Sequence, residues 1–154
     1  PGTGIGLAIC ERIVERHVCK TPAGEMTSET TYYIADPPTL TEKLVKDFVK
    51  DFPKLKIIVS HAAWPNIMPM MEVAFIRENV YVSPDLYMNG INTPGAHEYI
   101  KAAQFFLGDR LLFGTAYPSR PLKESVAAFL EWKLPAELQE KILYRNAARL
   151  FRIE

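Results

Sequence analysis

The 154-residue sequence has only two cysteines, three histidines and no excess of charge of either sign. Cys10 and Cys19 are too few for a disulfide framework, and their spacing is not that of a zinc motif. With 18 basic and 18 acidic residues, the formal net charge is zero, which gives no electrostatic reason to expect nucleic acid or an anionic membrane as a partner. No apolar run approaches the roughly 20 residues of a membrane span. The start does not have the pattern of a signal peptide, so we expect a cytoplasmic protein.

What the sequence does have is a regular alternation of predicted strands and helices. Apolar runs rich in β-branched residues predict strands at 31–35, 56–61, 79–83 and 110–115. Apolar spacing with a helical period predicts helices at 4–17, 39–52, 66–77, 95–108, 121–132 and 135–151. Pro121 and Pro135 suit the first position of a helix, and Gly108 suits a C-terminal cap.

This alternation predicts an α/β fold of about three to four βα units with parallel strands and extra C-terminal helices. Residues 20–31, which contain proline and glycine, indicate a loop before the first strand. A closed (β/α) barrel needs about eight strands and roughly 250 residues. The chain is therefore either a small open α/β layer or part of a larger barrel.

Four stretches together resemble the amidohydrolase-related family of metal-dependent hydrolases and decarboxylases, which fold as a distorted TIM barrel. They are FPKLKIIVSHAAWP at 52–65, NVYVS at 79–83, DRLLFGTAYPSRPLKE at 109–124 and EKILYRNAARLF at 140–151. Their order and spacing are similar to the C-terminal half of that family. The resemblance implies that 37–154 form this half of a barrel, a partial domain, and it leaves open the origin of the helix and loop expected at 1–36.

The resemblance also implies a chemistry. Members hold a divalent metal, often zinc, through His and Asp side chains at the C-terminal ends of barrel strands, where it activates water or polarises a small-molecule substrate. The expected reaction is hydrolysis or decarboxylation of a small organic acid or ester. The His-x-His pair that supplies two ligands in the family has no counterpart, because His17, His61 and His97 are the only histidines.

His61 matches the histidine that follows the KIIVS strand in the family, which implies a catalytic and metal-binding role. A single histidine at a strand end is, without the family, more often a structural hydrogen bonder. Trp64 is open to two interpretations, as part of a substrate pocket or as simple packing. Tyr117 and Arg120 follow the third strand tip and are expected to contact substrate, Arg120 through a carboxylate. A surface arginine near a helix start remains the alternative.

Ala116 is the main departure from the family. At this position the family motif reads FGTDYP, and its aspartate binds metal and accepts a proton, which a methyl group cannot do. We therefore expect impaired activity. Asp85 lies at a comparable strand end and could compensate, but a solvated loop aspartate is the favoured interpretation. Asp109 is expected in a turn at the opposite end of its strand, and His97 on a helix surface.

The first residues resemble a different family. PGTGIGLAICERIVERH at 1–17 is similar to the glycine-rich G2 box of histidine-kinase-type ATPase domains, in which backbone amides approach nucleotide phosphates. The other nucleotide-binding boxes of that family have no counterpart here. His17 is the last turn of a helix in this interpretation, and a metal-binding strand tip in the barrel interpretation. A mosaic join near residues 17–20 is a hypothesis that fits both.

Three functional hypotheses follow from the sequence. The first is a partial metal-dependent enzyme. The second is a non-catalytic remnant or interaction module, in which exposed sheet edges pair with a second copy of the chain. The third is a nucleotide-binding fragment.

Overall fold

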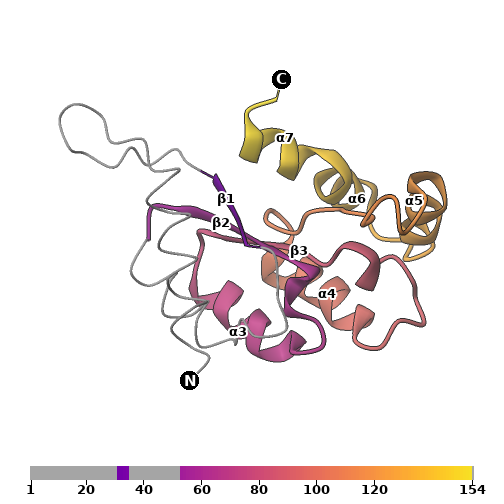
Figure 1. The fold of residues 1–154 in the computed structure, drawn as a ribbon, viewed down its shortest axis with the longest axis horizontal. Helices are drawn as coiled ribbons and strands as arrows, with labels where there is room; N and C mark the ends of the chain where they lie inside the picture. Colours follow the sequence, from indigo (N-terminus) through magenta and orange to yellow (C-terminus); the bar gives the residue numbers. More distant parts are fainter. Residues whose placement is uncertain (1–30, 35–52, 154) are drawn as a thin grey trace.

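The computed structural model describes residues 31–34 and 53–153. Three strands and five α-helices follow one another along these residues (Figure 1). They are β1 (Thr31–Ile34), β2 (Lys56–Ser60), α3 (Ile67–Ile76), β3 (Val80–Ser83), α4 (Ala96–Ala102), α5 (Leu122–Leu130), α6 (Ala136–Glu140) and α7 (Asn146–Phe151). The predicted α/β class and the predicted strands at 31–35, 56–61 and 79–83 are confirmed.

The strands form a parallel sheet in the order β1-β2-β3. The predicted fourth strand is reduced to one parallel bridge between Val82 and Leu111. Two hydrogen bonds make that bridge: Val82 N–H donates to the Arg110 carbonyl at 3.0 Å, and Leu112 N–H donates to the Val82 carbonyl at 2.9 Å. The register pairs Ser60 with Ser83, so the C-terminal ends of β2 and β3 lie level with each other.

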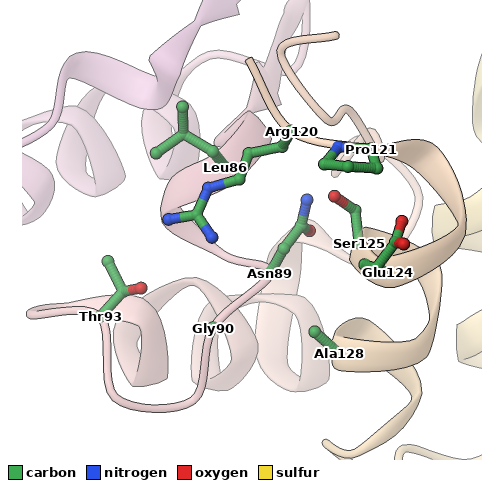
Figure 2. Close-up of a pocket in the computed structure, with 9 residues that line it drawn as sticks. All are labelled: Leu86, Asn89, Gly90, Thr93, Arg120, Pro121, Glu124, Ser125 and Ala128. Atoms are coloured by element: carbon green, nitrogen blue, oxygen red, sulfur yellow. The ribbon is translucent and has the colours of Figure 1, made fainter. Parts of the chain in front are cut away.

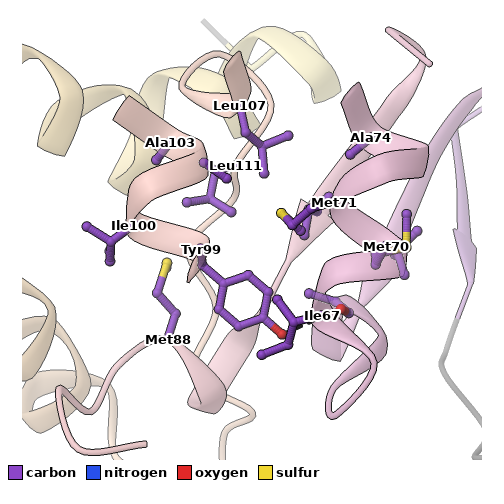
Figure 3. Close-up of a cluster of buried hydrophobic side chains, with 14 of the residues drawn as sticks. Ile67, Met70, Met71, Ala74, Met88, Tyr99, Ile100, Ala103, Leu107 and Leu111 are labelled. Carbon is purple, nitrogen blue, oxygen red and sulfur yellow. Dashed lines mark hydrogen bonds between the residues drawn. The ribbon is translucent and has the colours of Figure 1, made fainter. Parts of the chain in front are cut away.

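One face of the sheet carries the main hydrophobic core. Alternate strand residues, among them Ile57, Val59 and Val82, turn to this face because side chains alternate along a strand. They pack against the apolar faces of α3 and α4. Figure 3 shows the helix side chains of this core around the fully buried Tyr99. Each large aliphatic side chain buried here contributes about 1.5–3 kcal/mol to folding.

The opposite face of the sheet carries a smaller core. Ile58, Tyr81 and Leu112 point to this side and pack against Leu150 of α7. Both faces of the sheet are thus covered by helices, α3 and α4 on one side and α7 on the other (Figure 1). Strands covered on both faces read as continuous apolar runs, which is the pattern of KIIVS.

The predicted helix at 135–151 is one continuous rod with a wider turn in its middle. A π-helical turn, Lys141–Arg145, joins α6 to α7. Such a turn leaves backbone carbonyls without their usual i+4 partner. The Ile142 carbonyl instead accepts a hydrogen bond from Phe113 N–H at 3.1 Å, which ties the helix to the segment that follows the Leu111 bridge.

The other helices agree with expectation except at their ends. The helix predicted at 95–108 ends in a π-helical turn, Ala103–Leu107. Gly108 follows with φ −54°, so it is not the left-handed cap that glycine usually provides. A Cβ at Gly108 would lie 2.8 Å from the Ala103 carbonyl oxygen, and this close approach is what requires glycine there. Pro121 and Pro135 occupy the N-cap, one residue earlier than predicted.

Several expectations fall outside the described residues: the helices at 4–17 and 39–52, most of the loop at 20–31, and the phosphate-binding glycines. None of the helices within 31–34 and 53–153 has the length and hydropathy needed to span a bilayer.

Candidate functional site

The C-terminal ends of the strands share one unusual backbone feature. His61 after β2, Asp85 after β3 and Ala116 after the Leu111 segment have φ of 55°, 53° and 54°, the left-handed region. Ala62 and Ala63 continue the left-handed turn after His61. Each such residue costs roughly 1–2 kcal/mol relative to ordinary backbone. Backbone strain is typical of functional sites, so its concentration at this edge of the sheet marks the edge as a candidate site.

Asp85 is the centre of this edge. Its side chain accepts hydrogen bonds from Ser83 Oγ at 2.7 Å, from Ser60 Oγ at 3.0 Å and from the His61 backbone N–H at 3.2 Å. The residue is only 8% exposed. The solvated loop aspartate favoured by the sequence is therefore wrong. A carboxylate held by three donors is a fixed negative charge at the point where two strands end.

His61 lies directly against this carboxylate. Its Nδ1 is 3.1 Å from Asp85 Oδ2, which is ion-pair distance. The two atoms are nevertheless not aligned for a hydrogen bond. The His61 side chain is 39% exposed, whereas Nδ1 itself is buried, so the exposed part is the rest of the ring, which carries Nε2. The Nδ1 side of the ring thus faces the carboxylate, and the Nε2 side is the one that can meet a ligand.

Gly114 explains why the third apolar run stops at a glycine. A Cβ at this position would overlap Oδ1 of Asp85 and come within 3.2 Å of Ser83 Oγ. The Asp85 carboxylate thus fills the space beside the segment that leads to Ala116. Of the residues that form this cluster, Ser60, Ser83 and Gly114 were missed by sequence reasoning. The signal that could have found them is the level register of β2 and β3.

Trp64 packs close to His61 through Tyr87. Its ring stacks on Tyr87 with a centroid distance of 4.5 Å, and Tyr87 in turn meets the His61 ring edge at 5.7 Å. The indole N–H donates to the Pro94 carbonyl at 3.1 Å. These contacts show the packing role of Trp64, and its part in a substrate pocket stays a prediction.

The remaining predicted residues are less closely gathered. Tyr117 is 76% exposed beside Ala116. Arg120 lines a separate pocket with Asn89 and Glu124, and His61 is not part of its lining (Figure 2). His97 lies exposed on α4 with its ring edge against Trp132, as predicted for a surface histidine. His17 lies outside the described residues.

The donor set can be tested against the divalent metal that the sequence resemblance implies. Within 31–34 and 53–153, no three His, Cys, Asp or Glu side chains come together as metal ligands. Both Asp85 oxygens already accept hydrogen bonds, and Ala116 has no donor atom, so Nε2 of His61 is the one free donor of this cluster. The described residues do not fit a complete metal site, which in structural zinc centres takes four ligands.

Comparison with known proteins gives a consistent family assignment. The sequence profile of the amidohydrolase family matches residues 40–153. An uncharacterised TIM-barrel protein from Bordetella bronchiseptica is 34% identical, with a TM-score of 0.77 over 95% of this chain and 50% of that chain. A search of curated proteins finds no match.

Two more distant structures show the same fold. An amidohydrolase from Burkholderia multivorans with bound zinc is 15% identical, with a TM-score of 0.63 over 80% of this chain and 53% of that chain. A dihydroxybenzoic acid decarboxylase from Polaromonas sp., with bound manganese and the inhibitor 2-nitroresorcinol, is 18% identical, with a TM-score of 0.56 over 94% of this chain and 46% of that chain. The chain thus spans about half the length of the structures it matches.

Proposed function

The chain belongs to the amidohydrolase family, and from this premise we propose that it carries the C-terminal half of a site for hydrolysis or decarboxylation of a small organic acid or ester. The observation that carries the proposal is the contact between His61 and the buried carboxylate of Asp85, at the ends of parallel strands. Active sites of (β/α) barrels lie at this end of the strands. The zinc and manganese bound in related structures support a divalent metal in the complete site.

In this proposal His61 is the residue that handles protons. Asp85 holds the Nδ1 side of the ring, so the exposed Nε2 side faces an incoming molecule. A positioned general base or acid of this kind contributes typically 10²–10⁴-fold to a rate. Trp64 and Tyr117 follow two of the strand tips and would supply aromatic surface there. A divalent metal, when bound, would polarise a substrate oxygen or activate water, but the described residues give no basis for assigning it a step.

Ala116 is the reason we propose that activity is impaired. It stands at a strand tip with a left-handed backbone, which an aspartate also tolerates. An aspartate at position 116 would therefore require little change in the backbone. His17, the second predicted ligand, remains a proposal for the complete site.

Metal content of the purified protein tests this proposal. We would measure zinc and manganese by elemental analysis in the chain as it stands, in Ala116→Asp and in the surface control Ala127→Asp. Metal in Ala116→Asp alone is the expected result. Near-stoichiometric metal in the unaltered chain would contradict impairment, and metal in none of the three would contradict the proposed site.

A second candidate is a non-catalytic module that pairs with another copy of itself. The observation in its favour is an exposed aromatic pair, Phe75 of α3 at 59% and Phe105 at 80% exposure, with ring centroids 6.2 Å apart. Exposed apolar clusters of this kind are typical of interaction surfaces. The mass of the protein in solution, measured by light scattering with and without Phe105→Ser, tests this candidate, because a monomer in both samples would exclude it.

A further inference from the structure

The direction of the His61 ring is not set by a hydrogen bond. Its Nδ1 lies 3.1 Å from Oδ2 of Asp85, but the two atoms are not aligned for donation. The attraction between two charges has little directionality, so it does not define the plane of the imidazole. The His61 side chain is also 39% exposed. Such a side chain keeps one rotamer only where neighbouring groups pack against it.

Tyr87 supplies this packing. It ends the 3₁₀ turn Asp85–Tyr87, which follows β3. Its ring meets the His61 ring at 84°, with the centroids 5.7 Å apart, an edge-to-face arrangement that aromatic rings favour. The same turn carries the Asp85 carboxylate that lies at the Nδ1 side of the imidazole. One short turn therefore contacts His61 at two places.

The ring of Tyr87 is itself fixed in place. It stacks on Trp64 with 6° between the ring planes, and the Trp64 indole N–H donates to the Pro94 carbonyl at 3.1 Å. Met88, the next residue after Tyr87, is fully buried, and its carbonyl accepts a hydrogen bond from the Trp132 indole at 3.0 Å. The chain has two tryptophans, and both thus fasten the segment that carries Tyr87.

We propose that Tyr87 is a positioning residue for His61. Its ring, supported by Trp64, keeps the imidazole beside Asp85, so that the Nε2 side stays turned outward. A reacting group gains from being held in one direction by packed neighbours, and this inference rests on the proposed role of His61 in handling protons. The contact is made by the ring of Tyr87, so phenylalanine should replace it and an aliphatic side chain should not.

Acylation of His61 by diethyl pyrocarbonate tests the proposal, because this reagent attacks exposed, unprotonated imidazole nitrogens. Peptide mass spectrometry measures the rate at His61 relative to His97, which is exposed on α4. In the unaltered chain Nδ1 is buried, so only the Nε2 side can react. In Tyr87→Leu both nitrogens become accessible, so the relative rate should rise about two-fold or more, and a second acyl group should appear on His61. Tyr87→Phe should react like the unaltered chain.

Two further variants complete the test. Phe106→Leu removes a partly buried ring of the main core and should leave the relative rate unchanged. Trp64→Leu removes the ring that stacks on Tyr87, so it should increase the reactivity of His61 less than Tyr87→Leu does. It also keeps the test valid if Tyr87→Leu does not fold, because an unfolded chain exposes both histidines.

The proposal would be overturned if His61 reacted in Tyr87→Leu and Trp64→Leu as it does in the unaltered chain. It would also be overturned if Tyr87→Phe reacted like Tyr87→Leu, since the hydroxyl and not the ring would then matter. The experiment uses neither metal nor substrate. Its outcome is therefore separate from the metal analysis that tests the proposed function.

Discussion

The two ends of the parallel sheet use their polar side chains in opposite ways. At the N-terminal end, Arg110 Nη1 donates to the carbonyls of Ala74, Arg77 and Val80 at 2.9–3.0 Å. At the C-terminal end, Nδ1 of His61 and Oδ1 of Asn89 are buried without a hydrogen bond within the described part of the chain. One end satisfies backbone carbonyls, whereas the other holds two buried side-chain atoms that make no hydrogen bond with a described residue.

Backbone geometry shows the same contrast. Three strand tips at the C-terminal end carry non-glycine residues with positive φ. At the N-terminal end, Asn79 donates to the Leu55 carbonyl at 2.7 Å, and the fully buried Asn146 donates to the carbonyls of Gly108 and Leu111 at 2.8 Å. Barrel enzymes divide their ends in this way, with stability at one end and chemistry at the other. The contrast supports placing function at the His61 edge.

Removing the Arg110 guanidinium from the N-terminal end of the sheet should lower the free energy of unfolding most. Burial lowers the pKa of Arg110, whereas Glu78, Tyr81 and Asp109 act in the opposite direction. An arginine guanidinium nevertheless stays charged at every ordinary pH. Arg110→Met should lower the free energy of unfolding by about 2–3 kcal/mol, because three carbonyls lose a charged donor. Urea denaturation measures this loss.

The control is Arg145→Met, which removes a surface ion pair to Glu140 at 2.8 Å. It should cost less than about 1 kcal/mol. Equal losses in the two arginine variants would contradict the contrast between the ends.

Adding a methyl group at the C-terminal end of the sheet, by Gly114→Ala, should lower the free energy of unfolding by an intermediate amount. Gly114→Ala places Cβ on the Asp85 carboxylate, which has to move from its three donors. Overpacking of this kind costs about 1–3 kcal/mol, here expected near the lower end because the strand tip is partly open. Gly90→Ala is the matched control, since its Cβ meets only the Thr93 side chain, at 2.9 Å. Unfolding curves that show Gly90→Ala to be the more damaging change would refute this account of Gly114.

The smallest expected effect has the opposite sign. Ala116→Gly relieves a left-handed backbone at φ 54°, so it should raise stability by up to about 1 kcal/mol. The same change in the middle of α5, Ala127→Gly, should lower stability by about 1 kcal/mol. Thermal unfolding of the two variants distinguishes strain at the tips from ordinary backbone, because matching shifts would mean that the tips carry no strain.

The strands and the helices α3 to α7 could be predicted because local patterns determine them. KIIVS is apolar on both faces, and Leu122–Leu130 follows a helical period after a proline. His61 could be predicted only through family resemblance, since nothing local distinguishes it from a structural histidine. Asp85 was misjudged because its burial depends on Ser60 and Gly114, which lie 25 and 29 positions away. Arg110 gives no local signal either, because its acceptors lie on other elements.

The π-helical turn at Lys141–Arg145 has a consequence for how this chain tolerates insertions and deletions. Such a turn accommodates one residue more than regular α-helix, and each residue advances a helix by about 100°. Loss of one residue there would restore a regular helix. It would leave the residues after the turn facing as they do. Loss of one residue from the regular helix before it, Ala136–Glu140, would instead rotate everything after it by that angle, carrying Asn146 away from the Gly108 and Leu111 carbonyls and Leu150 away from the sheet. The last helix can thus still face the strands after the loss of a residue from this turn, but not after the loss of one from the helix before it.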